Sequence, residues 1–190
     1  MEFIAEVGAD VWTPKDILIP DAGMIGWIER HPPRRSNSLV KGFLGILSAQ
    51  MAQAGVYMAD TGGTARLLSQ GQQCFALNAG AAGTTYGIVV GTGTNAVALS
   101  DNKLQTQLTT NLYHGSGKVG YEWVSSSSCR IIASRTFANQ SASDMNITEI
   151  GLYAFGNTSN HIFCIDRTLY SITVPDFAGI TISYFFTISV

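Results

Sequence analysis

Short strand-like segments follow one another through the second half of the chain, and this succession limits the possible folds more than any other feature. The segments span residues 104–112, 119–124, 131–137, 147–155, 162–165, 169–174 and 180–190. Turns rich in Gly, Ser, Asn or Asp separate them, and no helical pattern lies between them, although βαβ units would require one. The sequence therefore predicts a mainly β fold, an antiparallel β-sandwich or jelly-roll-like domain.

The last segment, ITISYFFTISV at residues 180–190, alternates strictly. One face carries only apolar side chains: Ile180, Ile182, Tyr184, Phe186, Ile188 and Val190. Because the segment has no charge that would discourage pairing with other chains, it would aggregate as an exposed edge. We expect this strand to lie at the centre of its sheet or to be covered by another chain.

One amphipathic helix is predicted, at about residues 37–54. The sequence Ser36-Asn37-Ser38 supplies an N-cap. Apolar residues then recur every four positions, which predicts one buried face: Leu39, Phe43, Leu47 and Met51. Gly42 and Gly45 lower the helix propensity, so the helix must be stabilised by packing on a sheet or on another subunit.

Residues 1–35 are predicted to form an extended N-terminal arm with a Pro/Arg linker, and residues 36–190 a helix-plus-sandwich domain. The arm could reach onto a neighbouring subunit or fold back on its own domain. Three arginines of the linker, Arg30, Arg34 and Arg35, are candidates for docking an acidic partner, and the alternative is a solvated linker. Deletion of residues 1–30 is expected to leave a folded domain that assembles poorly.

The sequence GTGTNA at residues 91–96 matches the start of a dinucleotide-binding fingerprint. That mechanism needs a helix whose N-terminal amides hold the pyrophosphate, and an acidic residue about 20 positions later. Neither follows here, so no cofactor is expected. Gly91 and Gly93 are instead predicted to form a bend or bulge between two strand pieces. Substituting Val at Gly91 should then damage folding and affect no ligand.

No catalytic or metal site is predicted. The three histidines lie in unrelated segments without metal-ligand spacing, and no pair of the 13 acidic residues stands out as catalytic. Tyr121-Glu122-Trp123 is the most suggestive group, because an aromatic face beside a carboxylate can bind sugar. Alternation places both aromatic rings on one face, which favours a core pair opposite an exposed acid. The alternative is a glycan site that uses exposed aromatic residues: Tyr113, Tyr121 and Trp123.

Charged residues make up only 13% of the chain, against about 25% in a typical domain. A surface of uncharged polar residues is common in chains that pack against copies of themselves, and a free β-rich domain is the alternative. The formal net charge of −2 argues against nucleic acid or an anionic membrane as a partner, because neither could be held by long-range attraction. No apolar run approaches the ~20 residues of a membrane-spanning helix.

Several longer motifs resemble a family of bacteriophage virion structural proteins, over about residues 36–190. The motifs are GIVVGTG, the polar segment SDNKLQTQL, the hairpin HGSGKVGYEW, RTFANQSASDMNITEIGLY and the closing pair of strands. The resemblance implies a non-enzymatic component of the virion, located in a tail, neck, fibre or capsid surface and expected to be tail-associated. Its partners would be copies of itself and other virion proteins. A carbohydrate- or receptor-binding module at a fibre or tail tip, and a capsid decoration protein, are the alternatives.

Overall fold

The computed structural model describes residues 2–13, 18–19, 23–24, 27–35, 41–52, 56–68, 75–156 and 160–189. Strands dominate these residues, every strand pair is antiparallel, and one short helix accompanies them. The predicted mainly β, antiparallel class with one helix is therefore confirmed.

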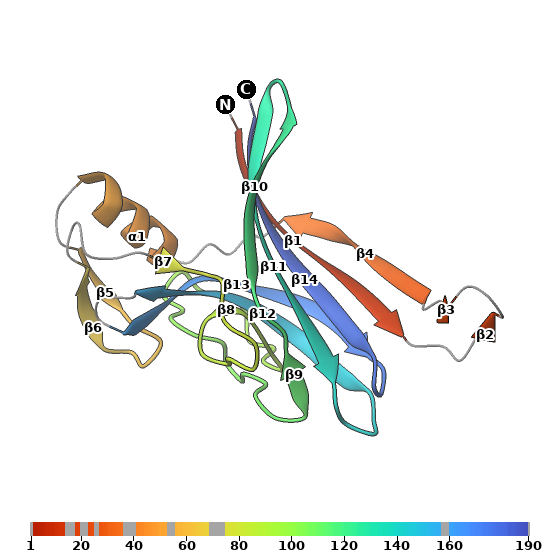
Figure 1. Ribbon diagram of the computed structural model, residues 1–190. Coiled ribbons are helices and arrows are strands. Elements are labelled where there is room, and N and C mark those ends of the chain that lie inside the picture. The colour runs from red at the N-terminus through yellow and green to blue at the C-terminus, as the bar shows by residue number, and fades with distance from the viewer. Residues whose placement is uncertain are drawn as a thin grey trace.

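Two sheets make up most of the fold (Figure 1). The large sheet has the order β10-β11-β14-β1-β4, and β9 pairs with the other end of β11. Its strands are β1 (Glu2–Thr13), β4 (Trp27–Arg35), β9 (Leu112–His114), β10 (Lys118–Ser125), β11 (Ser128–Asn139) and β14 (Gly179–Ser189). In the small sheet, β12 (Met145–Gly156) is flanked on one side by β13 (His161–Val174) and on the other by β7 (Phe75–Ala76) and β8 (Gly87–Gly91).

Two short hairpins complete the described strands. They are formed by β2 (Leu18–Ile19) with β3 (Gly23–Met24), and by β5 (Val56–Ala59) with β6 (Ala65–Leu68).

The main core lies between the two sheets. One cluster of buried side chains contains Val7, Phe137 and Ile182 from the large sheet together with Ile150 and Ile172 from the small sheet. Each strand contributes alternate residues to this cluster, because successive side chains point to opposite faces. The two sheets thus share one apolar interior.

The C-terminal strand lies at the centre of its sheet, which is the first of the two predicted alternatives. β14 pairs with β11 on one side and with β1 on the other. The alternate residues Ile180, Ile182 and Tyr184 are fully buried. Its uncharged apolar face is therefore protected by the chain's own fold along most of its length.

The described residues among the first 35 form strands, and the two long ones, β1 and β4, belong to the chain's own large sheet. β1 pairs with β14 along its length and with β4 on its other side. Val7 and Val11 of β1 are buried in the main core. A boundary at residue 35 therefore does not separate two units, and deleting residues 1–30 would remove an inner strand. In contrast to the expectation from the sequence, we therefore expect this deletion to destabilise the fold.

The helix α1 (Lys41–Ala52) lies within the predicted range, while the predicted N-cap at residues 36–38 lies outside the described residues. Its two glycines are explained by close packing. A Cβ on Gly42 would lie 2.1 Å from the carbonyl oxygen of Cys164 in β13, and one on Gly45 would lie 2.2 Å from the sulfur of Met58 in β5. The glycines therefore let α1 approach these strands closely.

The predicted apolar face of the helix is partly wrong. Leu47, assigned to that face, is 41% exposed, while Ala49 is buried and Phe43 packs against the main core. Leu39 lies outside the described residues, and the side chain of Met51 is likewise not described. The close approach of the glycine side of α1 to the strands explains the rotated face.

Candidate functional site

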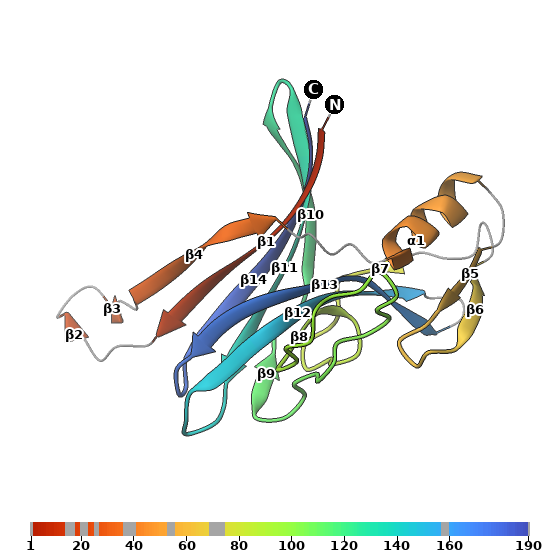
Figure 2. The ribbon, with the colours of Figure 1, turned by 180° about the vertical axis from the view of Figure 1, so that it is seen from behind.

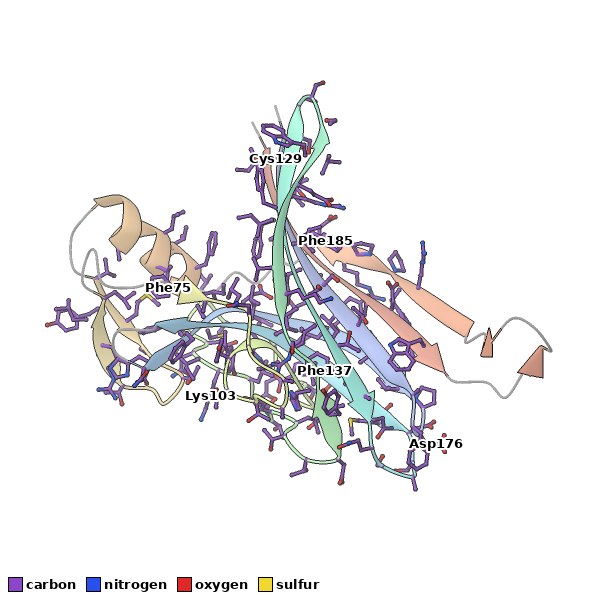
Figure 3. All side chains as sticks on the ribbon, viewed as in Figure 1. Phe75, Lys103, Cys129, Phe137, Asp176 and Phe185 are labelled. Carbon is purple, nitrogen blue, oxygen red and sulfur yellow. The ribbon has the colours of Figure 1, made fainter. Side chains whose placement is uncertain are left out.

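One end of the large sheet projects beyond the small sheet as a thin blade. We define the blade as β10, residues 128–132 of β11 and residues 185–189 of β14. Figures 1 and 2 show from two sides that it rises away from β12 and β13, with both chain termini beside its strands. Figure 3 shows Cys129 on the blade, far from Phe137 in the body.

Burial falls steadily along β14 from the body toward the tip of the blade. Tyr184 is fully buried, Phe186 is 9% exposed and Ile188 is 43% exposed, although alternation points all three to the same side. The ring of Phe186 stacks on Phe43 of α1, with centroids 6.1 Å apart. Beyond this contact, the core-facing side of the large sheet continues outward and becomes exposed.

The strands β10 and β11 widen this exposed strip. Tyr121 pairs with Ile131, which in turn pairs with Phe186, so these residues share one side of the sheet. We call the strip the open face, and its large side chains are Val119, Tyr121, Trp123, Ile131 and Ile188. Contiguous exposed apolar surface of this kind marks interaction sites on soluble proteins.

The aromatic pair at Tyr121 and Trp123 is exposed rather than buried. Alternation is as predicted, since Glu122 points to the opposite face of β10. However, Tyr121 is 60% and Trp123 72% exposed, while Glu122 forms an ion pair with Arg130. Arg130 also lies over the ring of Phe185, 4.9 Å from its centroid. The predicted core aromatic pair is therefore wrong, because the small sheet does not extend under this hairpin.

The outer edge of β10 is unpaired by any described strand. An edge strand presents a row of backbone donors and acceptors to any chain that can add to it. β10 is eight residues long, and an irregularity interrupts its pairing with β11 only near the tip, between Trp123 and Ser125. The blade thus offers both an apolar face and an open edge.

The three residues proposed for glycan contact do not lie together. The rings of Tyr121 and Trp123 are 6.0 Å apart and nearly perpendicular. Tyr113 of β9 pairs with Ala138, which points away from the core side occupied by Phe137. Tyr113 is therefore on the other face of the large sheet, and any aromatic site on the open face consists of Tyr121 and Trp123.

The arginines of the predicted docking patch also diverge. Arg30 pairs with Asp10 and lines a groove on the outer face of the large sheet. Arg34 lies over the ring of the buried Tyr170 in the small sheet, 5.0 Å from its centroid. A break in the strand register between these positions turns their side chains to opposite faces. The side chain of Arg35 lies outside the described residues.

Gly91 and Gly93 surround a buried carboxylate. Glu149 of β12 is fully buried, on the face of the small sheet that points away from the main core. A Cβ on Gly91 would lie 2.4 Å from the carbonyl oxygen of Thr106, and one on Gly93 would lie 2.4 Å from Glu149 Oε1. β8 ends at Gly91, and residues 96–99 do not form the second strand piece that the predicted bend would join. The two glycines are needed because a side chain at either position would collide with the loop backbone or with the carboxylate.

Glu149 anchors residues 92–111, which we call the covering loop. Its carboxylate accepts hydrogen bonds from the amides of Gly93, Gln105 and Thr106 at 2.8–3.0 Å. Burial raises the pKa of Glu149, but the Thr106 amide, Arg167 and the other two amides outweigh it, so the net pKa is lowered. The carboxylate therefore stays ionised and replaces a strand partner for the loop backbone.

Arg167 of β13 completes this network. Its guanidinium donates to Glu149 Oε2 at 2.8 Å, to Asp101 Oδ2 at 2.9 Å and to the carbonyl oxygen of Asn95 at 3.0 Å. Burial lowers its pKa, but the hydrogen bonds to Glu149 and Asp101 outweigh that effect and raise it. The Glu149–Arg167 pair joins β12 to β13, and the other described contacts of these two side chains hold the loop in place. The sequence does not reveal this cluster, because Glu149 and Arg167 lie on different strands.

A second buried cation lies in the body at Arg135. It is 1% exposed, and its guanidinium donates to backbone carbonyl oxygens of Tyr86, Ile88, Gly80, Gly83 and Gly115. Beside it, His114 is buried with its ring edge-to-face against Phe137, and neither ring nitrogen has a hydrogen-bond partner. Burial, and then the charge of Arg135, lower the pKa of His114 to about 4.

Within the described part of the chain, no group of three His, Cys, Asp or Glu side chains could hold a metal ion. No helix among those residues is long and apolar enough to cross a bilayer. Comparison with protein-family models, with curated proteins and with solved structures finds no match to this chain. The blade is therefore the candidate functional site, on the basis of its exposed chemistry.

Proposed function

We propose that this chain is a non-enzymatic structural component of a bacteriophage particle, tail-associated, that acts by subunit association through the blade. The observation that carries the proposal is the open face, where the core-facing side of the large sheet continues past its last covering contact at Phe186. Burying apolar surface is the main driving force of protein association. A partner that packs on the open face would extend the apolar core of this chain beyond Phe186.

Two sequence properties support this function. The motifs that resemble virion structural proteins include HGSGKVGYEW, which contains most of β10. The low content of charged residues, 13%, suits surfaces that become buried between subunits, since interface cores are depleted of charge. The partners would be copies of this chain and other virion proteins.

The experiment is incorporation of variants into phage particles. Trp123→Glu places a charge on the open face, and Leu99→Glu places one on the covering loop at a residue of the same exposure, 73% against 72%. Trp123→Glu should lower incorporation at least tenfold, and Leu99→Glu should leave it unchanged. Equal incorporation of the two variants would contradict the proposal. Low-resolution images of particles that contain the native chain would separate tail attachment from capsid decoration.

The exposed rings of Tyr121 and Trp123 also favour a second candidate, a carbohydrate- or receptor-binding module at a fibre or tail tip. Aromatic rings with exposed faces can stack on sugar rings, and both rings are more than half exposed. A glycan array separates the two functions. Specific glycan binding that is lost in Trp123→Ala would support the module, whereas a chain that acts by subunit association alone binds no glycan.

A further inference from the structure

We infer that the open edge of β10 binds β10 of a second copy of this chain, in antiparallel register centred on Tyr121. This inference rests on the proposed association function and names its first partner. β10 is the last strand of the large sheet on its side, and no described strand occupies its outer edge. Joining two such edges would merge two large sheets into one.

The residue pattern of β10 fits its own copy. Antiparallel pairing places directly opposite residues on the same face, so a two-fold axis through the edge must be centred on a residue. Centred on Tyr121, the register sets Val119 of each copy opposite Trp123 of the other, and Tyr121 opposite Tyr121. Aromatic pairs and aromatic–β-branched pairs are among the most favourable cross-strand contacts.

The charged residues of β10 favour the register centred on Tyr121 over the registers centred one residue to either side. With Tyr121 at the centre, Lys118 lies diagonal to Glu122 of the second copy, on the face opposite to the aromatic residues. Centring on Glu122 would set two carboxylates directly opposite each other, which is destabilising. Centring on Gly120 would move Trp123 opposite Gly117, outside the strand. Only the register centred on Tyr121 pairs residues 118–124 throughout with compatible side chains.

The join would also extend the open face. Tyr121 and Trp123 of both copies would lie on the same side of the merged sheet, next to Ile131 of each copy. A self-complementary contact of this kind closes as a dimer. It leaves the combined apolar face for a neighbouring protein of the particle, so pairing between copies and incorporation into particles are separate steps.

The test is disulfide cross-linking at the predicted centre. In a background with Cys74→Ser and Cys129→Ser, Tyr121→Cys should give a disulfide-linked dimer on mild oxidation. Directly opposite residues have Cα atoms about 4.5–5.5 Å apart, which is within the span of a disulfide. Val119→Cys alone should not cross-link, because its copy would lie about 13 Å away along the strand. Combining Val119→Cys with Trp123→Cys should restore the dimer.

Leu99→Cys, exposed on the covering loop, is the control for random collisions. Cross-linking of Val119→Cys but not of Tyr121→Cys would overturn the register. A native chain that stays monomeric in light scattering at high micromolar concentration would overturn pairing with a second copy. Incorporation of that monomer into particles would leave the proposed function standing, whereas a cross-linked dimer that never enters particles would refute the function and keep the pairing.

Discussion

Two sheet regions outside the main core, one on the small sheet and one on the blade, carry apolar and aromatic side chains, and of these two only the first is covered by the chain itself. On the small sheet, Tyr153 and Val89 lie under the covering loop, whose Leu104 is 2% exposed. On the blade, Tyr121 and Trp123 have no such cover and are more than half exposed. Figure 1 shows the loop beside β8 and the blade at the opposite end of the molecule.

The difference shows what covering a sheet face requires. An irregular loop brings backbone amides and carbonyl groups that must find hydrogen-bond partners once buried. Glu149 and Arg167 provide those partners for the covering loop. The large side chains of the open face are aliphatic or aromatic and mostly exposed, and none of them is a buried charged group that could anchor a loop of its own chain. The open face is suited to burial by the regular surface of another subunit.

Removing the anchor of the covered face should lower the free energy of unfolding more than removing an ion pair on the blade. Glu149→Ala leaves three loop amides and Arg167 without their buried acceptor, and breaking a buried pair in this way costs about 3–5 kcal/mol. Urea unfolding measures the loss. Glu122→Ala, which removes the exposed ion pair with Arg130 on the blade, should cost at most about 1 kcal/mol. Similar losses in both variants would show that the two faces do not differ in this way.

Glycine substitutions test the same contrast between the two faces through steric packing instead of charge. Gly91→Val introduces a Cβ 2.7 Å from Glu149 Oε1 and even closer to the Thr106 carbonyl oxygen, and overpacking of this kind costs about 3 kcal/mol. Gly120→Val on β10 meets nothing within 4 Å and should be neutral or slightly stabilising, because Val favours strands. Thermal unfolding compares the two variants. A destabilised Gly120→Val would mean that the blade is packed in solution.

The local periodicity of apolar residues predicted the antiparallel class, the helix and the burial of Ile180, Ile182 and Tyr184. These features depend on neighbouring residues, because periods of two and 3.6 are set by backbone geometry. The same periodicity could not predict which strand faces are covered. Tyr121 and Ile182 occupy equivalent positions in their patterns, but only Ile182 lies opposite the small sheet.

The covering loop shows a second limit of sequence reasoning. Residues 96–99 alternate like a strand, but residues 94 and 95 donate their amides to Gln105 and residue 98 to Asp101, and no ladder forms. Glu149, which holds the loop, is 56 positions from Gly93 in sequence. Contacts at such distances follow from the whole fold. The sequence therefore suggested a backbone role for Gly91 and Gly93, but it could not show that these glycines make room for the carboxylate of Glu149.

Lowering the pH should reduce the stability of the fold through protonation of His114. Its pKa is about 4 in the fold and about 6.5 in the unfolded chain, so the unfolded chain binds the proton first as the pH falls. The stability due to neutral His114 is complete above pH 6.5 and is lost between pH 6.5 and 4, by about 2 kcal/mol at pH 5. Urea unfolding at pH 7.5 and pH 5 should show this loss in the native chain.

The matched variant for this titration is His114→Leu, which removes the titrating group and keeps an apolar contact with Phe137. It should lose about 2 kcal/mol less than the native chain between the two pH values. Other groups, such as Glu149, titrate equally in both chains and cancel in the comparison. Equal losses in the two chains would mean that His114 accepts its proton in the folded state at an ordinary pH.

The smallest effect on stability is expected at the open face itself. Trp123→Thr removes a large aromatic ring, but the ring is 72% exposed, so the free energy of unfolding should change by less than about 0.5 kcal/mol. Leu104→Ala, under the covering loop, removes a smaller side chain and should cost about 3 kcal/mol, because it leaves a cavity. Unfolding should be measured in dilute protein, where association does not contribute. If Trp123→Thr is destabilised as strongly as Leu104→Ala, Trp123 is packed against its own chain and the open face does not exist; if it unfolds like the native chain but associates less at high concentration, the ring acts between subunits.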